Sequence, residues 1–237
     1  MPRSAAGLGS FWIGGFDMTC RTLAATIALA TVGLVTYQPA SAETLTVTGW
    51  ANGYRDVYIT SPITAHAGAG TFQVTDGANS FQAWCVDLFH ETNFGLAVND
   101  YSTSTSLFDT GTIDKLGQLA TGFLSMATDA TNSAAFQLAA WEIISEPAGS
   151  YAFDSGAFQA NGGSAASSGA LTTALGWLNS LPTTSEYSVS FWVSPTHQDL
   201  VVFSPVPEPA TYSLLLAGLG LMGIIVRRRM AARRDSV

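Results

Sequence analysis

Hydrophobic and polar residues alternate along several short segments, which predicts β-strands because successive side chains of a strand point to opposite faces. The first such segment is TLTVTGW at 44–50, and GTFQVTDG at 70–77 closes in an Asp-Gly turn. The run FQAWCVDLF predicts a third strand over 81–89. Near the end of the chain, the segments 187–194 and 198–204 predict a β-hairpin.

The middle of the chain changes to a helical period. A first helix is predicted from apolar residues spaced three or four apart, with Thr112 as its cap: Ile113, Leu116, Leu119, Ala120, Phe123, Leu124 and Ala127. Asn132 or Ser133 can cap a second helix over 134–144, and a third is expected over 170–181. Residues 151–169 are rich in Gly and Ser and predict a surface loop. The order favours an α+β fold, a β-sandwich or barrel with a helical insertion.

The N-terminal region has the layout of a secretory signal peptide over 18–42. A short basic start at 18–21 precedes the apolar stretch 23–35, and Ala40-Ser41-Ala42 is a small-x-small cleavage site. Residues 1–17 add nothing that a signal needs, so they are interpreted as an upstream extension from a misassigned start codon. The alternative is an uncleaved N-terminal anchor.

The C-terminal region, 205–237, combines two prolines, an apolar run and a cluster of arginines. The run 210–226 is uninterrupted and near the lower length limit for a transmembrane helix. The arginines that follow it would hold that end in the cytoplasm by the positive-inside rule. The sequence therefore predicts a C-terminal transmembrane helix at 210–226, and the simplest alternative role is an ordinary tail anchor.

This C-terminal region resembles a PEP-CTERM sorting signal. The resemblance rests on Pro207, Glu208 and Pro209, on the glycine-containing apolar segment, and on the closing arginines Arg227, Arg228 and Arg229. It implies processing by an exosortase, an integral-membrane protease of Gram-negative bacteria that also make exopolysaccharide. It further implies export by the secretion machinery, at least transient membrane anchoring, and a final place at the cell surface or in the extracellular matrix.

Residues 43–204 are left as one extracytoplasmic domain. They carry fourteen carboxylates against two cations, Arg55 and Lys115, and the whole chain has a net charge of -8. A surface of this kind repels phosphate backbones, which argues against nucleic-acid binding. It suits an exported protein that stays soluble by self-repulsion.

The number of cysteines limits the states that the Cys85 thiol can have. Of the two cysteines, Cys20 lies in the predicted signal peptide, so the mature protein keeps Cys85 alone. One cysteine cannot form an internal disulfide. An unpaired thiol in an oxidising compartment is expected to be buried, ligated or covalently used.

The flanks of Cys85 suggest covalent use. Cys85 stands in AWCVD, and fifty-two positions later Gln137 stands in FQLAAWE on a predicted helix. This pair of motifs resembles the thioester domains of bacterial surface adhesins. The resemblance implies that the Cys85 thiol attacks the Gln137 carboxamide with loss of ammonia, and that Asp87 and Trp141 are accessory residues. The activated acyl group would then take an amine or hydroxyl of another surface.

The match has departures. Phe136 stands where the family often has a hydroxyl residue, and Ala140 stands where it often has a β-branched one. The plain alternative is that Cys85 is a buried core residue, Gln137 an ordinary helix residue and Trp141 a core aromatic.

Other groupings are weaker candidates. A metal or hydrolytic site at Asp87 and Glu91 would need a helix there, and the predicted strand does not allow it. Asp109 and Asp114 are expected to serve turn and helix-start chemistry, with Ca²⁺ binding as the alternative. No nucleotide or nucleophile-elbow motif is present, so no cofactor and no enzymatic activity are expected.

Three functional hypotheses follow. The first is an exosortase-sorted surface or matrix protein that acts as a covalent adhesin through a Cys85–Gln137 thioester. The second is a structural biofilm-matrix protein that binds exopolysaccharide without covalent chemistry. The third is a secreted hydrolase.

Overall fold

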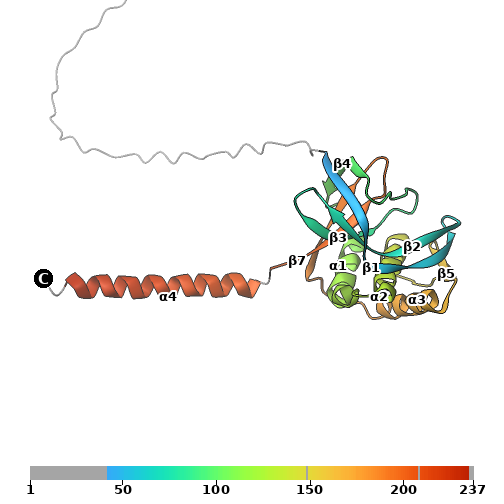
Figure 1. Cartoon of the computed structure of the whole chain (residues 1–237). Helices are drawn as coiled ribbons and strands as arrows, with labels where there is room; N and C mark the ends of the chain where they lie inside the picture. The colour runs from blue at the N-terminus through green and yellow to red at the C-terminus, as the bar shows by residue number, and fades with distance from the viewer. Residues whose placement is uncertain (1–41, 148, 208, 235–237) are drawn as a thin grey trace, which may run out of the picture. The chain divides into compact units, whose positions relative to one another are not determined.

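A computed structural model describes residues 42–147, 149–207 and 209–234 of the chain (Figure 1). The predicted upstream extension and nearly all of the predicted signal peptide lie outside these residues. The described part contains seven strands: β1 (Glu43–Ser61), β2 (Ala65–Thr75), β3 (Ser80–Cys85), β4 (Ala97–Ser104), β5 (Gln159–Gly162), β6 (Tyr187–Val193) and β7 (Leu200–Pro205).

The strands form one antiparallel sheet that closes on itself. Their order is β2-β3-β7-β6-β4-β1-β5, and β2 also pairs with β1, so six strands make a ring and β5 is added to β1. Closure leaves few free edges and places apolar side chains of every strand toward a shared interior. The prediction of a sheet structure with a helical insertion is confirmed, and the ring of pairings is that of a barrel.

Four α-helices and one short 3₁₀ helix are described: α1 (Thr110–Phe123), η1 (Leu124–Met126), α2 (Ala130–Ser145), α3 (Ala165–Leu178) and α4 (Pro209–Arg234). The predicted caps are wrong. Asp109 caps α1 by accepting from the Thr112 amide, and Asp129 caps α2 by accepting from the amides of Thr131 and Asn132. A carboxylate suits these positions because it accepts the unpaired amides of the first turn and complements the helix dipole.

Two predicted segments differ from the structure. The strand predicted over 81–89 ends at Cys85, and residues 86–96 form a loop up to β4, which the sequence pattern did not reveal. The loop predicted over 151–169 holds β5 and the first turn of α3. The short β5 gains its stability from pairing with residues 57–61 of β1, a long-range contact that local pattern cannot show.

Helix α2 is the centre of the molecule. Eleven of its sixteen residues are buried, including Phe136, whose ring packs against the rings of Trp84 and Phe203. The helix is apolar on nearly all sides because it contacts β1 and β2 on one side and α1 and α3 on others (Figure 1). Any polar side chain of α2 is therefore held in a fixed environment.

The C-terminal helix α4 contains the run 210–226 that predicted a transmembrane segment. Among the described residues, no helix combines the length and the apolar character that crossing a membrane requires. The predicted transmembrane helix is thus not shown, although a helix is formed there.

Candidate functional site

The structure brings Cys85 and Gln137 together in the interior. The Cys85 backbone N–H donates to Gln137 Oε1 at 2.9 Å, and Gln137 Nε2 donates to the Cys85 carbonyl at 2.7 Å. Cys85 is 2% exposed and Gln137 is 1% exposed. The carboxamide thus pairs with the last residue of β3 in the way a neighbouring strand would, and both buried backbone groups are satisfied.

The start of α2 is fixed to a bulge in β1, and this sets the position of Gln137. The Asn52 side chain donates to the Ala127 carbonyl at 2.7 Å, and the Arg55 guanidinium donates to Thr131 Oγ1 at 3.0 and 3.1 Å. Gly53, with φ of +80°, lies against Ala130, where an added Cβ would come within 2.9 Å of the Ala130 Cβ. Gln137 follows two turns later on the same rigid helix.

The Cys85 side chain is a protonated thiol in this arrangement. Its Sγ donates to the Asp87 carbonyl at 2.9 Å. Burial raises the pKa of the thiol to about 12, against opposing effects of the Trp141 indole and the Asp87 backbone, while the charges of Asp87 and Asp199 raise it by smaller amounts. A thiolate nucleophile therefore forms only if another group takes the proton.

Trp141 lies one helical turn after Gln137 and is 2% exposed. Its indole N–H has no hydrogen-bond partner among the described residues, although it is close enough to favour the charged form of Cys85. A buried tryptophan N–H normally finds an acceptor. The indole is consequently available to an oxygen or sulfur atom that gains negative charge at Cys85.

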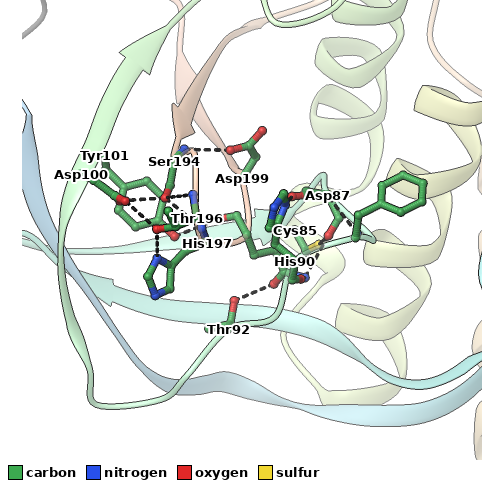
Figure 2. A network of polar contacts seen from close by, with 12 residues as sticks. Cys85, Asp87, His90, Thr92, Asp100, Tyr101, Ser194, Thr196, His197 and Asp199 are labelled. Atoms are coloured by element: carbon green, nitrogen blue, oxygen red, sulfur yellow. Dashed lines mark hydrogen bonds and ion pairs between the residues drawn. The ribbon is translucent and has the colours of Figure 1, made fainter.

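Asp87 joins the site to the following loop (Figure 2). Its Oδ1 accepts from the Phe89 amide at 2.8 Å, and its Oδ2 lies 2.5 Å from His90 Nδ1. Gln198 Nε2 donates to the Asp87 carbonyl at 3.0 Å. The predicted strand over 81–89 would have turned His90 away from Asp87, so that prediction is wrong here, and His90 is the residue that it missed. The Asp-x-x-His spacing of a tight turn is the only signal that could have found it.

A cavity of about 520 Å³ lies over Cys85. Aromatic rings make much of its wall, and Trp50 stacks on Phe72 with a centroid separation of 4.8 Å. Cys85, His90 and Trp141 all line this cavity. A small molecule in it would therefore be bounded by the residues that carry the thiol, the imidazole and the indole.

A second polar network lies at the turn between β6 and β7 (Figure 2). Ser194 Oγ donates to Asp100 at 2.7 Å, and Thr196 Oγ1 donates to the other oxygen of Asp100 at 2.6 Å. Ser194 Oγ also accepts from the amides of Thr196 and His197. The serine hydroxyl is thus used to shape a turn, and no histidine nitrogen faces it as a base would face a nucleophile.

Asp109, another acidic candidate, takes a structural place. Asp109 accepts from the backbone and hydroxyl of Thr112, which confirms its role at a helix start and lowers the pKa of its carboxyl. In the part of the chain that the structure describes, no three side chains of His, Cys, Asp or Glu are grouped to hold a metal.

A buried carboxyl follows the site on α2. Glu142 is fully buried, and its Oε1 accepts from the Ala152 amide at 2.8 Å. Its Oε2 and the Tyr151 hydroxyl have no hydrogen-bond partner among the described residues. Burial raises the pKa of Glu142 to about 7, with a smaller contribution from the charge of Glu146. The carboxyl is protonated in mildly acidic solution.

The C-terminal segment matches a known sorting motif. Residues 205–229 match the family model described as the PEP-CTERM protein-sorting motif. This confirms the resemblance drawn from Pro207, Glu208, Pro209 and the arginines 227–229. The chain therefore carries a sorting motif of exported proteins.

The globular part is similar in structure to the N-terminal domain of the Streptococcus pyogenes pilus tip adhesin Cpa. The similarity covers 71% of this chain and 99% of that chain, with 16% identity and a TM-score of 0.39. A likeness of this extent does not establish a shared fold or activity. The comparison with curated proteins gave no match.

Proposed function

We propose that this chain is an exported surface protein, sorted by an exosortase, whose globular part forms an internal Cys85–Gln137 thioester for covalent attachment. The sorting motif at 205–229 supports export, a stage at the membrane and later display at the cell surface. The two hydrogen bonds between the Gln137 carboxamide and the Cys85 backbone support the thioester. They hold the carboxamide against the backbone of the residue that carries the thiol before any bond forms.

The proposed chemistry needs no cofactor. The Cys85 sulfur attacks the Gln137 side-chain carbonyl carbon, the carbon–nitrogen bond breaks, and the thiol proton leaves with the nitrogen as ammonia. Fixed neighbours can reach effective molarities on the order of 10⁵ M, which compensates for the poor reactivity of a carboxamide. An amine of another surface later attacks the same carbon, forms an amide and returns the proton to sulfur.

Intact mass tests the thioester directly. Protein purified after export is expected to be lighter than its processed sequence by one ammonia, because the thioester forms with that loss. Methylamine should add to Gln137 and produce a thiol that alkylating reagents then label. Mass spectrometry before and after methylamine measures both changes, and peptide mapping locates them.

The opposite result is equally definite. A protein of full sequence mass, whose thiol reacts only after unfolding, would show Cys85 to be an ordinary core residue. Burial of the thiol is what an unreacted core cysteine would show. The second candidate function is then a surface or matrix protein that binds without a covalent bond. The sorting half of the proposal would be untouched.

The arginines of the motif provide a test of sorting. Replacing Arg227 and Arg228 with serine should reduce the processed, surface-displayed form at least several-fold, because these charges orient the C-terminal segment. The control variant replaces Arg233 and Arg234 with serine. These two arginines lie beyond the motif at 205–229, so this variant should be processed normally. Cell fractionation with immunoblotting measures the processed size. Equal processing of both variants would count against a role for the motif arginines.

A further inference from the structure

His90, which is paired with Asp87, lines the same cavity as Cys85. Two histidines line this cavity, His66 and His90. His66 lies 3.2 Å from Asp56, and the side chains of His66 and Asp56 are each more than 60% exposed. His90 is 45% exposed, and the Asp87 side chain that holds it is 13% exposed. The backbone carbonyl of Asp87 also accepts a hydrogen bond from the Cys85 thiol. One residue thus contacts both the thiol and the imidazole.

We infer that His90, oriented by Asp87, moves the protons of the thioester reactions at Cys85. This inference rests on the proposed function and extends it by naming the residue that performs acid–base catalysis. Because Nδ1 of His90 faces the Asp87 carboxylate, Nε2 is left for proton transfer. The need for such a group is set by the buried thiol, which does not ionise alone at neutral pH.

Every proton is accounted for in both reactions, thioester formation and acyl transfer. In formation, His90 takes the proton of the Cys85 thiol, the sulfur bonds to the Gln137 carbonyl carbon, and His90 returns the proton to the departing nitrogen, which leaves as ammonia. In transfer, His90 takes a proton from the incoming amine or hydroxyl and gives it to the Cys85 sulfur as the carbon–sulfur bond breaks.

The surrounding charges suit an imidazole that becomes cationic in passing. Asp87 is in direct contact with it, and Asp199 is near enough to His90 for the two charges to interact. Glu91 lines the same cavity. Hydroxyl acceptors depend on such a base more than amines do, because a neutral hydroxyl is a weak nucleophile. The Asp87–His90 pair therefore allows hydroxyl-bearing molecules, as well as amines, to accept the acyl group.

His90→Ala tests this role in protein purified after export. We expect methylamine incorporation at neutral pH to slow by roughly ten- to a hundred-fold, within the usual range for general-base catalysis. Added imidazole should restore the rate, because a free base of the same kind can enter the cavity. A purely structural defect would not be rescued in this way. His197→Ala is the matched control, since His197 is hydrogen-bonded to Thr196 and does not line this cavity.

The outcomes separate the two proposals. A wild-type thioester with an unchanged rate in His90→Ala overturns the inference and leaves the proposed function standing. Wild-type protein of full sequence mass removes both. If His90→Ala is isolated at full mass, loss of one ammonia on incubation with imidazole supports the inference, and no change with imidazole contradicts it.

Discussion

Gln137→Ala is expected to unfold at a clearly lower urea concentration than Cys85→Ala, although each variant should abolish methylamine incorporation completely. The alanine removes both partners of the Cys85 backbone, whose N–H and carbonyl are buried. Each unsatisfied group costs about 1–3 kcal/mol, so the loss relative to the protein without the thioester should be about 2–6 kcal/mol. Relative to the same unbonded protein, Cys85→Ala removes one sulfur atom and keeps the backbone pairing, so about 1 kcal/mol is expected. Neither variant can form the thioester, so the comparison between them does not depend on it.

Urea denaturation followed by circular dichroism measures the difference. Gln118→Ala is the control, because its side chain makes one exposed hydrogen bond of 3.4 Å to Thr183 and should change stability by less than about 0.5 kcal/mol. If Gln137→Ala and Cys85→Ala lost equal stability, the carboxamide would not be supporting the end of β3.

Glu142→Gln is expected to remove a pH-dependent loss of stability. The pKa of Glu142 is raised in the folded protein, from 4.5 to about 7. Below about pH 4.5 the carboxyl is protonated in both states. Between about 4.5 and 7 the unfolded state ionises while the folded state keeps its proton, so the free energy of unfolding falls as pH rises through this window.

At one to two pH units above 7, this loss in wild type should be about 3 kcal/mol, and Glu142→Gln should lack it. The amide keeps an oxygen for the Ala152 N–H, so the local hydrogen bond is preserved. Urea midpoints measured across this range check the effect. The exposed Glu186, changed to glutamine, should follow the wild-type pH dependence. A Glu142→Gln curve parallel to wild type would show that the carboxyl is not protonated in the fold.

Local sequence pattern predicted most of α1 and the β6–β7 hairpin, because their apolar residues recur at a fixed period. It predicted most of α2, which is apolar on nearly all sides, as a run of apolar residues after a candidate cap. It did not find β4 or β5. Both depend on partners distant in sequence, and β4 has the polar composition of a loop, AVNDYSTS.

The candidate site was predicted only as far as its motifs reach. Cys85, Gln137, Asp87 and Trp141 were singled out from two short motifs, and the structure places all four beside one another. His90 was not foreseen, since the apolar residues on both sides of Asp87 suggested that the strand continued. The chain turns there because the Asp87 side chain takes the Phe89 amide from strand pairing.

The position of β7 determines how the proposed adduct would respond to mechanical tension. With one end bonded at Gln137 and the other retained through the C-terminal segment, only residues from 137 onward lie on the covalent path. Pulling force therefore reaches β7, which is hydrogen-bonded to β3 on one side and β6 on the other. A strand held by two neighbours shares force among many bonds, whereas β5, paired with β1 alone, would peel one bond at a time. The tether therefore leaves the domain from a strand that is paired on both sides.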